Sequence, residues 1–213
     1  MAAQFDTVFD DWLDFLESIG FAARAHLNPP ATAEDIAAAE AAIGHALPDD
    51  IKALYARADG QRPVLEIADM RPGTLLTPLF GGYDFVPLAQ ALDDYRGWTD
   101  VIEDWPPQSD PHAFITVRGD DPVERAYWRS GWFSFAIDGG GNSYAADLAP
   151  KAGGAYGQVI LIGPDEDERR VLAPSLTAFL EDALTRRPGL DPDETWSTDR
   201  GTLIAFFEME PSG

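Results

Sequence analysis

The stretch from Trp128 to Ile162 constrains the fold more than any other part of the sequence. Trp132 to Asp138 is rich in aromatic and β-branched residues, and its alternation places Phe133, Phe135 and Ile137 on one face of a strand. A Gly-Gly-Gly-Asn turn follows at 139–142, and residues 143–148 return along the first strand. Glycines at 153, 154 and 157 form a second turn before a third strand at 158–162. Short turns between neighbouring strands predict an antiparallel meander.

Amphipathic helices are expected on both sides of this sheet. Apolar residues of 5–19 recur at helical spacing, which predicts a helix over 5–20 that either covers the core or docks a partner. Thr32 and Asp35 match a capping box for a helix ending near Gly44, and Pro48 precedes the next helix. We interpret Glu40 as a structural residue that bonds a helix or loop amide. A last helix is expected from Ser175 to Arg187.

Shorter elements fill the intervals. Strands are expected at 64–67, 74–80, 113–117 and 170–173, with an acidic hairpin tip at 163–168. Residues 202–209 are apolar enough for a final strand or short helix. The whole pattern predicts the α+β class, with one antiparallel sheet covered by N-terminal and C-terminal helices. We expect one domain over 1–188, with its core at about 27–185, and a C-terminal extension over 189–213 that packs on it.

Charge is the most pronounced feature of the composition. The chain has 37 acidic and 15 basic residues in 213, which gives a formal net charge of −22. Such a field repels nucleic-acid phosphates and anionic lipid, so neither nucleic acid nor membrane is an expected partner. A basic protein is favoured instead, although an acidic surface also serves solubility alone.

Several classes of site are not expected from the residues present. There are no cysteines, so disulfides, thiolate metal sites and a cysteine nucleophile are excluded. His26, His45 and His112 lack metal-ligand spacing, and we expect each at the surface or in a turn. We therefore expect no enzyme activity, no metal and no cofactor. The N-terminus lacks the pattern of a signal peptide and no run is long enough to span a membrane, so a cytoplasmic location is expected.

The segment from Trp98 to Pro107 is the most binding-like part of the chain. Two tryptophans, Trp98 and Trp105, flank a run that includes Glu103 and Asp104, and we interpret the segment as a loop. Aromatic residues with acidic neighbours suit a basic protein partner. The alternative is that both tryptophans pack on the sheet.

A second group of residues is assigned to turns. Oxygen atoms of Asp138, Asn142 and Asp147 are able to ligate a hard cation, but their spacing does not match an EF-hand. We interpret them as turn residues whose side chains bond the backbone, together with Gly140 and Gly157.

Three blocks of sequence resemble one known family. The first is Ile-Asp-Gly-Gly-Gly-Asn from Ile137, with an aspartate at 147 and Gly-Gln-Val-Ile from Gly157. The second runs from Leu27 through Leu-Pro-Asp-Asp at 47–50 to Asp-Gly at 59–60, and the third is the helix that follows Ala173. In this order, the blocks resemble the SUKH superfamily, in its fungal cell-wall regulator (Smi–Knr) branch.

The resemblance implies a non-enzymatic binding module. Members of the superfamily are largely bacterial immunity proteins that neutralise polymorphic toxins, whereas the fungal branch regulates cell-wall synthesis. It therefore implies an immunity protein that occupies the cleft of a basic toxin domain. The alternative is a regulatory or scaffold protein of cell-wall or envelope synthesis. An enzyme that uses paired carboxylates is the third hypothesis, and it requires two acids in one cleft.

Overall fold

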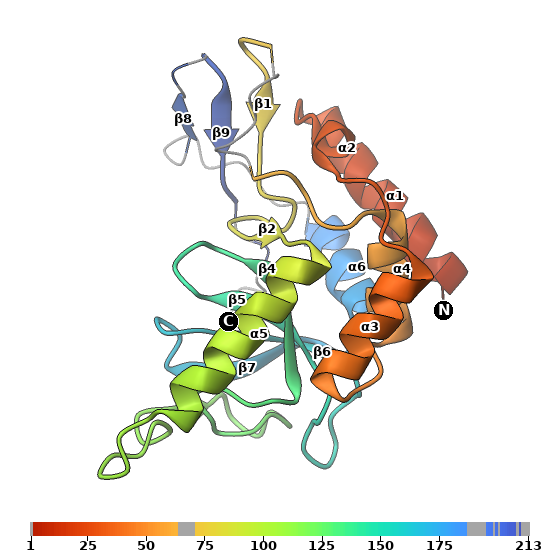
Figure 1. Cartoon of the computed structure of the whole chain (residues 1–213). Coiled ribbons are helices and arrows are strands. Elements are labelled where there is room, and N and C mark those ends of the chain that lie inside the picture. Colours follow the sequence, from red (N-terminus) through yellow and green to blue (C-terminus); the bar gives the residue numbers. More distant parts are fainter. Residues whose placement is uncertain are drawn as a thin grey trace.

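A computed structural model describes residues 2–63, 71–186, 195–197, 199, 201–207 and 209 of the chain (Figure 1). The expected strand at 64–67 and the linker at 188–192 lie outside these residues. The helices are α1 (Ala2–Ser18), α2 (Ala23–His26), α3 (Ala33–Ile43), α4 (Asp49–Arg57), α5 (Leu88–Glu103) and α6 (Leu176–Arg186). The strands are β1 (Leu75–Leu76), β2 (Asp84–Phe85), β3 (Thr116–Val117), β4 (Trp132–Ile137), β5 (Ser143–Asp147), β6 (Gln158–Ile162), β7 (Glu168–Ala173), β8 (Thr195–Ser197) and β9 (Leu203–Ala205).

The predicted meander is confirmed and forms most of a six-stranded sheet. The strand order is β2-β4-β5-β6-β7-β3, and β4 to β7 pair as antiparallel neighbours. A register shift between Ser134 and Ala136 interrupts the β4–β5 pairing. At the far edge β3 pairs with β7 in parallel, with Thr116 opposite Glu168. The strands predicted at 74–80 and 113–117 are much shorter than expected, because only two residues of each enter a sheet.

Helices cover both faces of this sheet (Figure 1). One face carries the main hydrophobic core, where Phe133, Phe135 and Leu161 are buried together with residues of α1, α3, α4 and α6. The opposite face carries a smaller core around Trp132 and Ile160, and residues of α5 pack against it. The α+β class is thus confirmed. The sheet is covered from the middle of the chain as well as from its two ends.

Local signals fix the helix ends and the loops between them. Thr32 and Asp35 form the predicted capping box, in which the Thr32 hydroxyl accepts from the Asp35 amide at 3.1 Å and the Asp35 carboxylate accepts from Thr32. Glycine 44 ends α3 at a φ of 72°. The Glu40 carboxylate accepts the Leu47 amide at 2.8 Å, which confirms a structural role for Glu40 and holds the loop before α4.

A second, three-stranded sheet joins the two halves of the chain. Strand β9 lies between β1 and β8, parallel to β1 and antiparallel to β8. Residues 203–205 therefore form the final strand that the apolar run at 202–209 predicts. Phe207 and Met209 lie in the main core, where the Phe207 ring is 6.0 Å from Trp12 and 6.2 Å from Phe21.

Among the described residues, no helix has both the length and the apolar character needed to cross a bilayer.

Candidate functional site

Four aromatic side chains, those of Trp98, Trp105, Phe114 and Tyr127, meet at the C-terminal half of α5. The Tyr127 ring centre lies 5.5 Å from that of Trp98, 5.7 Å from Trp105 and 5.6 Å from Phe114. The interpretation of 98–107 as a loop is wrong for its first half, because α5 continues through Gly97 to Glu103. Trp98 and Ile102, four residues apart, both pack on the smaller core, and this burial outweighs the low helix propensity of glycine.

The aromatic cluster is only partly covered. Phe114 is 47% exposed and Val101 is 43% exposed, and both belong to the few large apolar side chains that are exposed in the described chain. Trp98 lies half-buried against the smaller core, as the packing alternative expects, and it also lines a groove of about 240 Å³ with Asp94, Gly97 and Val101. The indole N–H of Trp105 donates to the Ser109 hydroxyl at 3.0 Å.

Acidic residues surround these rings. Glu103 and Asp104 are exposed, and with the residues the structure describes neither carboxylate forms an ion pair or a side-chain hydrogen bond. Burial raises the pKa of the Tyr127 phenol, and the nearby Asp165 and Asp167 carboxylates raise it further while Arg169 opposes them. We call this region the acidic aromatic surface, which consists of Trp98, Glu103, Asp104, Trp105, Phe114, Tyr127, Asp165 and Asp167.

A buried arginine positions the Tyr127 segment. The Arg169 side chain, on β7, is fully buried, and its guanidinium donates to the carbonyls of Ala126 at 2.9 Å, Tyr127 at 2.8 Å and Glu166. Burial lowers its pKa to about 10. His112 adds a second tie, because its Nδ1 accepts the Tyr127 amide at 2.9 Å. The backbone of Tyr127, the ring that contacts the other three, is therefore held by intramolecular hydrogen bonds.

The predicted turn residues fall at two ends of the sheet. Asp138 accepts the amides of Gly140 at 2.6 Å and Asn142 at 3.0 Å, and the Asn142 side chain bonds both Asp138 and Asp165. This network joins the β4–β5 turn to the acidic tip of the β6–β7 hairpin. The same tip contributes Asp165 and Asp167 to the acidic aromatic surface.

Asp147 and Gly157 lie where β5 ends and β6 is about to begin. The buried Asp147 carboxylate accepts from the Ala149 amide and from the Gln158 side chain, both at 3.0 Å. Burial raises its pKa. Gly157 has a φ of 83°, and its amide donates to the Asp147 carbonyl at 2.8 Å. Because these contacts are all within the chain, we propose that Asp147 and Gly157 stabilise the turn between β5 and β6.

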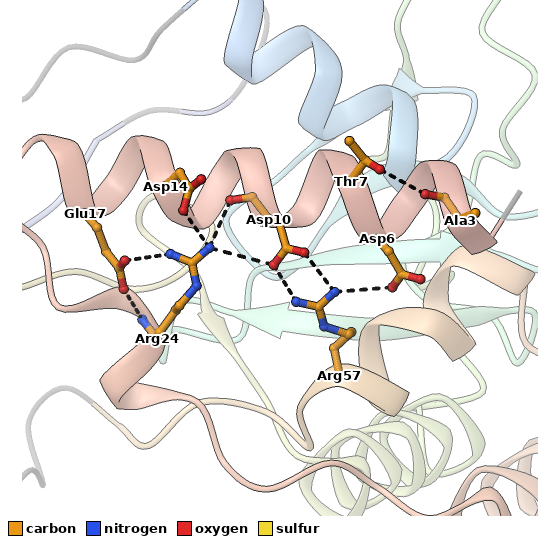
Figure 2. Close-up of polar contacts among 8 residues, drawn as sticks. All are labelled: Ala3, Asp6, Thr7, Asp10, Asp14, Glu17, Arg24 and Arg57. Atoms are coloured by element: carbon orange, nitrogen blue, oxygen red, sulfur yellow. Dashed lines mark hydrogen bonds and ion pairs between the residues drawn. The ribbon is translucent and has the colours of Figure 1, made fainter.

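The acidic face of α1 differs from the acidic aromatic surface because arginines form ion pairs with its carboxylates (Figure 2). Arg57 of α4 contacts Asp10 at 2.5 Å and Asp6 at 3.5 Å. Arg24 contacts Asp14 at 2.7 Å and Glu17 at 2.6 Å. Hydrogen bonding to Arg57 lowers the pKa of Asp10. These ion pairs hold α1 onto α2 and α4.

The histidines do not all lie where the sequence predicts. His26 is only 2% exposed and lies in a helix, so its expected position at the surface or in a turn is wrong. It is the last residue of α2, and the 23–26 turn folds back against the core. Within the described residues, no three histidine or acidic side chains converge to hold a metal ion.

Comparison with known proteins places this geometry in a family. Residues 30–182 match the sequence profile of the SMI1 / KNR4 family (SUKH-1). The chain belongs to this family. The match runs from α3 into α6 and contains the six-stranded sheet, so it includes the acidic aromatic surface, whereas α1, α2, β8 and β9 lie outside it.

Curated relatives carry regulatory names. The chain is 26% identical over 183 residues to the "Cell wall assembly regulator SMI1" of Saccharomyces cerevisiae, which covers 74% of this chain and 35% of the relative. It is 39% identical over 94 residues to a "KNR4/SMI1 homolog" of Yarrowia lipolytica, and this alignment covers 41% of this chain and 13% of the relative. It is 40% identical over 75 residues to the "Glucan synthesis regulatory protein" of Neurospora crassa, and this alignment covers 33% of this chain and 14% of the relative. Each match thus spans only a minor part of a longer SMI1 / KNR4 protein.

Some residues of the surface were not assigned from the sequence. Tyr127 connects the cluster, yet no sequence pattern assigns it to a site, and Phe114 is expected only as part of the strand at 113–117. The density of aromatic residues at 127–133 was the available signal. Neither the Arg169 contacts nor the approach of the hairpin tip has a sequence signal, because they join segments about 40 residues apart.

Proposed function

We propose that this chain is a regulatory protein-binding module, and that the acidic aromatic surface at the end of α5 binds its partner. The observation that carries the proposal is the coincidence of partly exposed aromatic rings with carboxylates that pair with no described residue, inside the region shared with the SMI1 / KNR4 family. The names of the relatives support a role in assembling or synthesising cell wall or envelope. We place this activity in the cytoplasm and propose no catalytic step for it.

The chemistry of the surface favours a basic protein partner. Aromatic side chains supply much of the binding energy at interfaces and lose little conformational entropy, especially on a fixed backbone. Carboxylates at the rim, within a chain of net charge −22, accelerate the encounter with a basic surface. We therefore expect the affinity to fall as the salt concentration rises.

Neutralisation of a basic toxin domain is the second candidate. The same charge and the same surface suit it, because such a toxin also presents a basic patch. Two of these relatives are named as regulators and none as an immunity protein, so the regulatory function is our first proposal.

Deletion and complementation in the native host test the regulatory function. We expect the deletion to give a cell-wall or envelope defect that the wild-type gene corrects and the double reversal Glu103→Lys, Asp104→Lys does not. The matched control is Asp11→Lys, Glu34→Lys, which makes the same charge change at two exposed positions of α1 and α3. This control is expected to correct the defect as the wild-type gene does. A silent deletion contradicts the regulatory function.

Co-expression separates the second candidate. The chain is expressed with the toxin domain encoded beside its gene, where the genome carries one, and surviving cells are counted against an unrelated acidic protein. Rescue by this chain alone, lost with the Glu103→Lys, Asp104→Lys variant, favours immunity. Absence of rescue together with an envelope defect on deletion supports the regulatory function.

A further inference from the structure

A cleft of about 560 Å³ lies away from the acidic aromatic surface and shares no residue with it. It opens between the first turns of α4 and α6 and the turn that joins β5 to β6. Its walls include Gln4, Pro48, Asp49, Lys52, Tyr156 and Glu181. This volume suits a small ligand or one or two side chains of a peptide.

Tyr156 is the most exposed large apolar side chain of the cleft. The residue is 51% exposed, although its hydroxyl already donates to the Ala46 carbonyl at 2.6 Å. The next residue, Gly157, lies so near Pro48 that an added Cβ would be 2.5 Å from the proline Cγ. The turn is thus fastened to the loop before α4. The ring is held in place with part of its surface free, which lowers the entropy cost of stacking a ligand on it.

The charges of the cleft favour a cation. Among the residues that the structure describes, its lining contains the carboxylates of Asp49, Asp50 and Glu181 and one ammonium group, that of Lys52. One oxygen of Glu181 accepts the Gln4 side-chain amide at 3.0 Å. Lys52 is shared between Asp49 at 3.4 Å and Glu40 at 3.8 Å. An anion finds few free donors at the start of α6, because Asp50 accepts the Thr177 amide and Ser175 accepts the Ala178 amide.

We propose that this cleft binds an arginine side chain of a partner polypeptide. A guanidinium is planar and weakly hydrated, so it stacks on an aromatic ring and pairs with carboxylates more readily than a lysine ammonium does. Tyr156 supplies the aromatic face, and the carboxylates of Asp49 and Glu181 supply the acceptors. Stem methylenes of the arginine contact Pro48 and Ala178. The proposal is independent of the function of the acidic aromatic surface.

A titration followed by ¹⁵N NMR tests this proposal with a blocked triarginine peptide. We expect saturable shifts at Tyr156, Gly157 and the first turns of α4 and α6. The uncharged analogue tricitrulline is expected to give no shifts there, and trilysine to bind at least about threefold more weakly, since it cannot stack as a planar group.

Substitutions define the site. Tyr156→Ala is expected to weaken triarginine binding about tenfold, and Glu181→Gln, which keeps the shape of the wall, about threefold. Phe114→Ala is the matched control, because Phe114 is exposed to a similar extent (47%) on the other surface. It is expected to bind triarginine as the wild type does, and so is Glu103→Lys, Asp104→Lys.

Three outcomes overturn the proposal. The first is a set of shifts that spread over the acidic surface without saturating, which indicates general attraction to the net charge. The second is binding centred on Tyr127. The third is wild-type affinity in a folded Tyr156→Ala protein or, where that variant is unfolded, in Glu181→Gln. Failure of the double reversal to complement the deletion, with triarginine binding intact, concerns only the proposed function.

Discussion

At the scale of single residues, the fold buries two cationic or potentially cationic groups by different means. Arg169 is fully buried, and three backbone carbonyls accept from its guanidinium, so it keeps its hydrogen bonds without a carboxylate within ion-pair distance among the described residues. His26 is buried and its Nε2 finds no partner among the described residues. Burial and the nearby Arg62 charge lower the pKa of His26 to about 4. Arg169 therefore fixes a segment, whereas His26 makes stability depend on pH.

The first prediction concerns acid stability. The unfolded chain takes up a proton on His26 near pH 6.5, whereas the folded chain does so near pH 4. Protonation thus favours the unfolded chain as the pH falls between these values, and the free energy of unfolding should drop by up to about 3 kcal/mol from this group. Urea unfolding at several pH values measures it.

His26→Gln should remove this part of the pH dependence. The control is His45→Gln, at a half-exposed histidine, which leaves His26 in place and should keep the acid dependence of the wild type. Equal slopes for wild type and His26→Gln between pH 6.5 and 4 contradict the prediction.

At the scale of elements, contacts between segments decide how α1 and the β5–β6 turn are held. Helix α1 buries Phe5, Phe9 and Trp12 in the main core, and its outer face is tied to α2 and α4 by Arg24 and Arg57. The β5–β6 turn is held by the close approach of Gly157 to Pro48. For each of these contacts the chain offers a control residue of the same type without the long-range contact: Arg96 for Arg57, and Gly153 for Gly157.

The second prediction concerns the arginine between α4 and α1. Arg57 is about one-third exposed, bonds Asp10 at 2.5 Å and lies 5.7 Å from the centre of the Phe9 ring. Arg57→Met should lower the free energy of unfolding by about 1–2 kcal/mol, between the values for exposed and buried pairs. Arg96→Met breaks an exposed pair with Asp93 on α5 and should change it by less than about 0.5 kcal/mol. Equal effects measured by urea unfolding would show that the tie adds nothing.

The third prediction compares two glycines of the β5–β6 turn. Both have positive φ, 96° for Gly153 and 83° for Gly157, but only the second has a near neighbour. Gly153→Ala should cost about 1 kcal/mol from backbone strain. Gly157→Ala should cost roughly 2–4 kcal/mol, since the new methyl group also meets Pro48. Thermal unfolding of both variants measures the difference, and similar losses would refute the close approach as a source of stability.

At the scale of the whole molecule, segments from the two ends of the chain complete one core. Phe21 bridges to Leu75, Leu75 pairs with Leu203, and Phe207 and Met209 then enter the core beside Trp12. The C-terminal residues therefore contribute to the stability of the domain. The net charge of −22 acts at the same scale, because its field extends beyond any single ion pair and attracts positively charged groups in general.

The fourth prediction tests this closure. Phe207 is 3% exposed, so Phe207→Ala should lower the free energy of unfolding by about 3–5 kcal/mol within a single cooperative transition. Phe114→Ala removes the same ring from an exposed position at the other end of the molecule, and should cost less than about 1 kcal/mol. A separate early transition in Phe207→Ala would show instead that the C-terminal strand unfolds independently of the core.

The sequence predicted the features that depend on neighbours along the chain. The meander from Trp132 to Ala173, the capping box at Thr32 and the turn at Asp138 are encoded by side-chain alternation, by residues three apart and by glycine with asparagine. The candidate surface was predicted in part. Trp98, Glu103, Asp104 and Trp105 do lie together, but Tyr127 and Phe114 join them only through folding, and α5 passes through a glycine because its apolar face is buried.

The sequence by itself thus determined the class of the fold, the strand order of the meander and the acidic character of the surface, because these follow from local periodicity, turn chemistry and total charge. Only the tertiary structure decided which acids remain free. Asp6, Asp10, Asp14 and Glu17 are paired with arginines, whereas Glu103 and Asp104 pair with no residue of the described part of the chain. It also created the cleft at Tyr156. The pairing of the acids and the shape of the cleft depend on contacts between residues far apart in the chain, and such contacts cannot be predicted from composition or residue spacing.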